Sequence, residues 1–163
     1  MKAYKINVLL PEDKSQIENI ASILDDKIIS MIGGDVNLDD YLCDPTVNVF
    51  EVDKITQYIY LPKEIDIHEL IVDLSDLGLI ESWEDITEGL KRDYTQFDGI
   101  ANMDDYNFNR ITLLSNFLVK TLTVDDVLDY IKESGYESLN TFQISALKGW
   151  PLCVSIEELD SDI

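Results

Sequence analysis

Apolar and polar residues alternate along residues 3–10, and the alternation ends at Pro11. Alternation with a period of two, rich in β-branched residues, is typical of a half-buried strand. Ser15 and Glu18 then have the spacing of a capping box, in which each side chain satisfies a free amide at a helix start. We predict a helix here that a Gly-Gly pair ends. Its apolar stripe is Ile17, Ile20, Ala21, Leu24, Ile28 and Met31.

The same order of signals returns further along the chain. Residues 46–52 and 57–61 are strand candidates, Pro62 closes the second, and Asp66 and Glu69 again have capping-box spacing. This repetition indicates either a duplicated unit or a common strand–helix connection used twice, and the second interpretation is preferred. The apolar stripe of the helix is Ile67, Leu70, Ile71, Leu74 and Leu77, and Gly78 is placed to end it.

The second half of the chain is richer in helical signals. Short strands are predicted around residues 83–86 and 92–97. A helix is predicted from Asp104 and Asp105, which suit the positive end of the helix dipole, to about residue 122. Residue 138 onward is predicted to form a short helix or strand. Between these two segments, a further helix is predicted to begin at Thr123 with Asp126 and to end at Gly135. Its apolar residues are Val124, Val127, Leu128 and Ile131.

Taken together, these elements predict an α+β fold. We expect an elongated molecule with small, mostly antiparallel sheets and helices packed alongside, divided into two or three small units. The expected units are residues 1–56, residues 57–135 and residues 136–163, the last with an acidic tail. The sequence leaves open whether the first 56 residues form a unit of their own.

Charge narrows the classes of function. The chain has 33 acidic and 12 basic residues among 163, a net charge of −21, yet 45% of it is apolar and can form a core. Direct binding to nucleic acid or to an anionic membrane requires Lys and Arg clusters that the chain lacks. Cys43 and Cys153 form no disulfide framework, and no run of apolar residues is long enough for a membrane helix. We expect a cytoplasmic protein.

Catalytic chemistry has little support in the sequence. His68 is the single histidine and is expected as an exposed helix residue. With Cys43 and Cys153 it supplies too few ligands for a zinc site. Residues 35–44 are acidic but lack the spacing of a calcium-binding EF-hand, so that only weak cation binding is left open there. We expect no catalytic residue, no cofactor and no metal, and hence no enzyme.

Acidic rows on two predicted helices are the more informative pattern. Steps of three or four residues place the members of each row on one side of a helix. Like charges at this spacing destabilise an isolated helix, and an ordinary solvated face usually includes more lysine. Carboxylates spaced by about 5 Å along a helix are an approximate substitute for the charges of a nucleic-acid strand. The rows are Asp66, Glu69, Asp73 and Asp76, and Asp125, Asp129 and Glu133.

Residues 57–135 combine a strand closing on Leu-Pro, an acidic leucine-rich helix, and the segments EDI at 84–86, RDYTQF at 92–97 and MDDYNFNR at 103–110 before two further helices. This combination resembles the ArdA family of antirestriction proteins. It implies a DNA mimic from a phage or mobile element, acting in a bacterial host cell without catalysis. Such proteins bind the modification core of type I restriction enzymes. The first 56 residues match less clearly, and the chain after residue 135 is short for the family's last domain.

Charge and resemblance together predict that the partner is a basic, DNA-binding protein or complex. The first candidate is a type I restriction-modification enzyme. A CRISPR effector is a close variant, and an immunity or regulatory protein that neutralises a basic toxin or enzyme is the alternative. A homodimer is left open. The residues expected to bind the partner are Asp66, Glu69, Asp73, Asp76, Glu84, Asp85, Asp93, Asp98, Asp104, Asp105, Asp125, Asp129 and Glu133.

Overall fold

The computed structural model describes residues 1–9, 12–32, 46–50, 55–94 and 108–149. Contacts divide the chain into two compact units, Met1–Ile86 and Thr87–Ile163. Each unit is described by itself below. The expected boundary between residues 56 and 57 falls inside a strand of the first unit, and the expected boundary after residue 135 falls inside the second.

The first unit contains a four-stranded sheet in which every pair of neighbouring strands is antiparallel. The strand order across the sheet is β2-β3-β1-β4. The two central strands, β1 and β3, pair along their whole length, from Lys2 opposite Leu61 to Val8 opposite Ile55. The strands are β1 (Lys2–Val8), β2 (Thr46–Phe50), β3 (Ile55–Leu61) and β4 (Ile80–Asp85).

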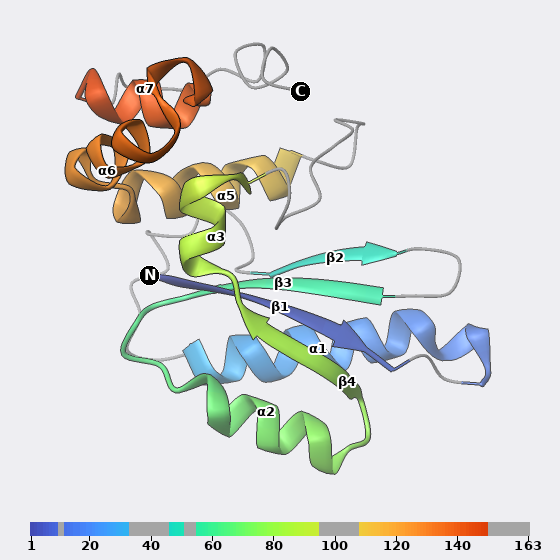
Figure 1. Ribbon diagram of the computed structural model, residues 1–163. Coiled ribbons are helices and arrows are strands. Elements are labelled where there is room, and N and C mark those ends of the chain that lie inside the picture. The colour runs from blue at the N-terminus through green and yellow to red at the C-terminus, as the bar shows by residue number, and fades with distance from the viewer. Residues whose placement is uncertain (10–11, 33–45, 51–54, 95–107, 150–163) are drawn as a thin grey trace. The chain divides into compact units, whose positions relative to one another are not determined.

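Two helices complete this unit and cover one face of the sheet (Figure 1). They are α1 (Ile17–Ile32), preceded by the short 3₁₀ helix η1 (Lys14–Gln16), and α2 (Ile67–Asp76). The chain order β1-α1-β2-β3-α2-β4 with two interleaved halves is the split βαβ, or ferredoxin-like, arrangement. The repeated strand, Leu-Pro, cap and helix of the sequence therefore corresponds to the two β-α-β halves. The predicted α+β class and antiparallel sheet are confirmed.

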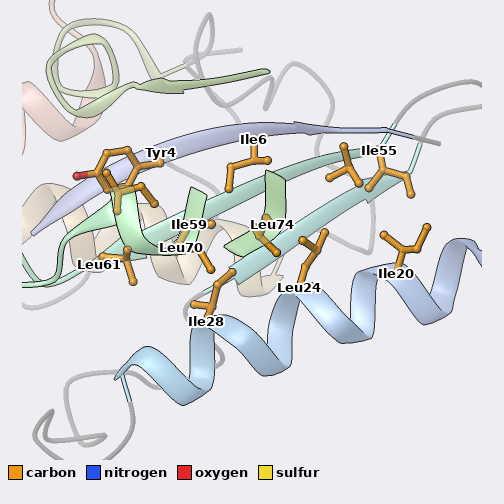
Figure 2. Close-up of a cluster of buried hydrophobic side chains, with 12 residues drawn as sticks. Tyr4, Ile6, Ile20, Leu24, Ile28, Ile55, Ile59, Leu61, Leu70 and Leu74 are labelled. Atoms are coloured by element: carbon orange, nitrogen blue, oxygen red, sulfur yellow. The ribbon is translucent and has the colours of Figure 1, made fainter. Parts of the chain in front are cut away.

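An apolar layer lies between the sheet and the two helices (Figure 2). Alternate residues of β1 and β3 face this layer, and α1 directs residues spaced by four toward it. All seven side chains of β3, one of the two central strands, are buried. The buried cluster consists of Tyr4, Ile6, Val8, Ile20, Leu24, Ile28, Ile55, Ile59, Leu61, Ile67, Leu70 and Leu74.

Caps fix the ends of the helices in the first unit. The turn before α1 is held by Asp13, whose carboxylate accepts hydrogen bonds from the Ser15 amide at 3.0 Å and hydroxyl at 2.7 Å. Ser15 was expected to be the cap itself, whereas here it donates to the residue that caps. At α2 the Asp66 carboxylate accepts from the His68 amide at 2.9 Å, as an N-cap does. Gly78 ends α2 at a φ of +69°, a conformation that favours glycine.

The second unit is helical in the described residues. Its core contains Tyr94 and Phe142, whose rings meet edge to face with centroids 5.4 Å apart. Gln143 is 3% exposed, and its amide group donates to the last carbonyls of α3, Lys91 and Arg92, at 3.1 Å each. The helices are α3 (Thr87–Arg92), α5 (Phe108–Thr121), α6 (Val124–Ser134), η3 (Tyr136–Ser138) and α7 (Thr141–Leu147).

Several local predictions require correction. The strand predicted over residues 92–97 is wrong in its described part, because Arg92 is the last residue of a helix and Tyr94 belongs to a helical core. The apolar spacing also predicted more buried residues on the helices than the structure contains. Leu77, which follows the last residue of α2, is 54% exposed, and Val124 and Leu128 of α6 are 47% and 43% exposed. The Gly-Gly pair at 33 and 34 lies outside the described residues.

Leu24→Ala is expected to lower the free energy of unfolding by about 2–5 kcal/mol, because Leu24 is fully buried between α1 and the sheet. The matched control is Val72→Ala on α2, which is 57% exposed and is expected to change stability by less than about 0.5 kcal/mol. Urea unfolding followed by far-UV circular dichroism measures both. Equal effects of the two variants would contradict the packing of α1 on the sheet.

Candidate functional site

The outward side of α2 is acidic. The apolar residues Ile67, Leu70 and Leu74 bury the opposite side of this helix. The row of Asp66, Glu69, Asp73 and Asp76 is consequently exposed along its full length. At 1.5 Å of rise per residue, the row extends over about 15 Å. We name these four residues the α2 row.

Few cations lie close to the α2 row. The Lys27 ammonium of α1 is 3.8 Å from the Asp73 carboxylate, and both side chains are largely exposed. An exposed pair at this distance contributes little stability. Among the described residues, Glu69 and Asp76 have no cation within 4.0 Å. Most of the negative charge of the α2 row is therefore available to a partner.

The acids of β4 do not form a single row. Glu84 lies opposite Lys5 and Asp85 lies opposite Tyr4 in the pairing with β1. Neighbouring residues of a strand point to opposite faces of the sheet. Asp85 therefore shares the helix-covered face with Tyr4, whereas Glu84 shares the other face with Lys5. One flat partner cannot contact the acids of this strand together.

The row on α6 carries compensating cations. Lys132 binds Asp129 at 2.7 Å, and the Arg92 guanidinium of α3 binds Glu133 at 2.8 Å while lying 5.1 Å from the centre of the Tyr130 ring. The sequence gave no sign of the contact from Arg92, which reaches α6 only through the fold. The α6 row (Asp125, Asp129 and Glu133) is exposed, but it is substantially neutralised within the protein.

The first turn of α6 is bound by a nearly buried lysine of α3. Lys91 is 10% exposed and binds Asp126 at 3.1 Å and the exposed Glu88 at 3.3 Å. Asp126 also completes the predicted capping box with Thr123. Burial alone would raise the pKa of Asp126, but the hydrogen bonds from Thr123 and the hydrogen bond and charge of Lys91 outweigh it, and the pKa lies below its ordinary value. This pair stabilises the second unit rather than presenting charge.

A pocket of about 320 Å³ opens where α2 begins, beside the ends of β1 and β4. No pattern in the sequence indicates this pocket, because its walls come from segments far apart in the chain. Trp83 contacts the rings of both Tyr4 and His68, with centroids 6.1 Å and 5.4 Å away. The lining residues are Lys2, Tyr4, Lys63, Glu64, Ile65, Asp66, Ile67, His68, Trp83 and Asp85.

The electrostatics of this pocket are set by carboxylates around an aromatic wall. Burial raises the pKa of the Tyr4 hydroxyl, and the charges of Asp85 and Asp66 raise it further. The Lys2 ammonium is 3.5 Å from Asp85 and partly offsets its charge. Asp66 therefore belongs both to the α2 row, as its first member, and to the wall of the pocket.

The remaining predicted residues contribute less. Asp93 is half-buried in the second unit. His68 is exposed on α2, as expected, and it touches Trp83. Within the described residues, no three His, Cys, Asp or Glu side chains are placed to hold a metal ion, and no helix could cross a membrane. Asp98, Asp104, Asp105, Cys43, Cys153 and the acidic segment 35–44 lie outside the described residues.

Comparison with known proteins gives no relative: no family model, no curated protein and no solved structure matches the chain.

Asp126→Asn is expected to lower the free energy of unfolding by about 1–3 kcal/mol at neutral pH, because the nearly buried Lys91 ammonium loses its closest charged partner. Asp125→Asn on the same turn is the control. It removes an equal charge from an exposed position and is expected to cost at most about 1 kcal/mol through the helix dipole.

The difference between wild type and Asp126→Asn should also depend on pH. The pKa of Asp126 in the folded protein lies below the ordinary value of 3.8, so its contribution is complete above that value and is lost as the pH falls through the folded-state pKa. Urea unfolding near neutral pH and below about pH 4 should show the difference shrinking in acid. A difference that stays constant would mean that Asp126 acts without its charge.

Proposed function

We propose that this protein is an inhibitor that binds a basic, DNA-binding protein and excludes DNA from its groove. The α2 row carries the proposal. It is a set of exposed carboxylates on one side of a helix, with few cations near it, in a chain of net charge −21. A partner with a positive groove gains both steering and complementarity from such a surface.

The first candidate for the target is a type I restriction-modification enzyme. The support is the resemblance of residues 57–135 to the ArdA family, together with the charge. A CRISPR effector with a positive channel for its heteroduplex is a related candidate. The inhibitor would act from the cytoplasm of a bacterial host by occupancy alone and would require no cofactor.

A second candidate is an immunity or regulatory protein that covers the site of one basic toxin or enzyme. The observation in its favour is that the α2 row and the pocket lie together in the first unit, whereas the α6 row is largely neutralised. A compact patch suits a single enzyme site, and a long stripe of charge suits a DNA groove. Competition with duplex DNA separates the two candidates.

Replacing Glu69, Asp73 and Asp76 together by Gln, Asn and Asn is expected to weaken competition with DNA by at least tenfold. The reason is the loss of three neighbouring charges from the contact, whereas any one of them is a small part of a distributed field. The measurement is displacement of a labelled duplex from a purified type I methyltransferase. Asp66 is left unchanged because it also lines the pocket at the start of α2.

The matched control replaces Asp125, Asp129 and Glu133 by Asn, Asn and Gln, which changes the net charge equally. We expect a smaller loss, because two of these three carboxylates are already paired with Lys132 and Arg92. Equal losses would show that total charge matters and that α2 is not the contact. Failure of the wild type to displace DNA at low salt would exclude this target.

The complex is also expected to weaken as salt rises. Screening shortens the reach of exposed charges from about 10 Å at 0.1 M to about 3 Å at 1 M ionic strength. Stopped-flow association at several salt concentrations should show the association rate falling more than the dissociation rate rises. Association and dissociation rates that do not change with salt concentration would contradict an electrostatic contact.

A further inference from the structure

We propose that the pocket at the start of α2 binds the side chain of an arginine of the partner protein. This inference rests on the proposed function and names the part of a basic partner that the first unit recognises. The pocket lies at one end of the α2 row, since Asp66 belongs to both. A partner that contacts the row therefore passes the mouth of the pocket.

The size of the pocket suits one long side chain. Its volume of about 320 Å³ is at the lower end of sites that hold small molecules, which run from about 300 to 1,000 Å³. One wall is aromatic, with Trp83 touching Tyr4 and His68. Aromatic and arginine side chains that fill pockets in this way provide much of the affinity of protein interfaces.

The charged residues around the pocket determine whether it favours a cation or an anion. The charged residues that line the pocket are Glu64, Asp66 and Asp85 with Lys2 and Lys63, which leaves one negative charge in excess. The net charge of the whole chain, which is −21, also repels anions. The faces of aromatic rings attract cations as well. A cationic group therefore fits here better than a phosphate or carboxylate.

Arginine fits better than lysine, because a planar guanidinium stacks on rings and binds carboxylates with two parallel hydrogen bonds. The protein already contains this arrangement in its second unit. There the Arg92 guanidinium lies 5.1 Å from the centre of the Tyr130 ring and 2.8 Å from a Glu133 carboxylate oxygen. The pocket offers the same two kinds of group, a ring and carboxylates, to a guanidinium from outside.

The test uses the full chain, labelled with nitrogen-15, and blocked amino acids as probes. N-acetyl-arginine amide is expected to shift the indole signal of Trp83 saturably in the millimolar range, and Trp83→Phe identifies that signal among the two tryptophans. The citrulline analogue, equal in shape but uncharged, should bind at least tenfold more weakly. The lysine analogue should also bind more weakly. Equal shifts by citrulline, stronger binding of inorganic phosphate, or no shift with arginine would each overturn the proposal.

Two variants with equal charge change locate the site. Asp66→Asn keeps the helix cap, because Asn is as good an N-cap, and is expected to weaken arginine binding several-fold. Asp26→Asn on α1, exposed and outside the pocket, should leave it unchanged. Urea unfolding checks that both variants are folded. If Asp66→Asn and Asp26→Asn bind arginine alike, the pocket is not the site.

Competition with DNA separates this inference from the proposed function. Trp83→Leu keeps every carboxylate and an apolar side chain, and it should weaken displacement of DNA several-fold. If it displaces DNA as well as wild type while the α2 triple variant fails, the pocket inference is wrong and the inhibitor proposal stands. If wild type binds arginine but displaces no DNA, the DNA-groove proposal is wrong, and the pocket recognises an arginine of another basic partner.

Discussion

The apolar layer between the sheet and its two helices is the interaction on which the first unit depends. A chain with an excess of carboxylates gains no stability from its charge, and self-repulsion opposes the compact state. Burial of residues such as Leu24, Ile59 and Leu70 must offset that repulsion. The same layer determines which side of α2 faces outward. The acids of the α2 row are exposed because Leu70 and Leu74 are held against the sheet.

The position of the pocket follows from the topology of the sheet. In the split βαβ arrangement, β1 lies between β3 and β4, so the start of β1 comes beside the end of β4. The connection from β3 to α2 adds Lys63 and Asp66 at the same end. Residues from three separate segments, 2–4, 63–68 and 83–85, thus line the pocket. The pocket proposed for an arginine side chain and the α2 row thus meet at the start of one helix.

In the second unit, basic residues pair with several of the described carboxylates. Lys91, Arg92 and Lys132 each bind a carboxylate of α6, and Gln143 joins the end of α3 to the start of α7 through its hydrogen bonds. The hydrogen bonds of Gln143 satisfy backbone groups that helix ends leave free. The described acids of α6 thus mainly pair within their own unit. For this reason we propose the first unit, where the α2 row has fewer cations near it, as the partner-binding part.

Local signals in the sequence determined much of the secondary structure. The alternation at residues 3–10, the Asp66 and Thr123 caps and the helix-ending Gly78 depend on neighbours within a few residues, and each has its predicted position in the structure. Helical spacing likewise predicted the exposed α2 row, because position on a helix decides which side a residue occupies. The α+β class followed from these elements.

Only the tertiary structure decided which segments meet. The neutralisation of Glu133 by Arg92 depends on α3 packing beside α6, and residue 92 was predicted in a strand because its segment is short and mixed. Which face of the sheet Glu84 and Asp85 each occupy depends on the pairing of β4 with β1. The pocket around Trp83 depends on strand order, which no local pattern encodes. Contacts between distant segments are set by the packing of the whole core, and a pattern with a range of a few residues cannot contain them.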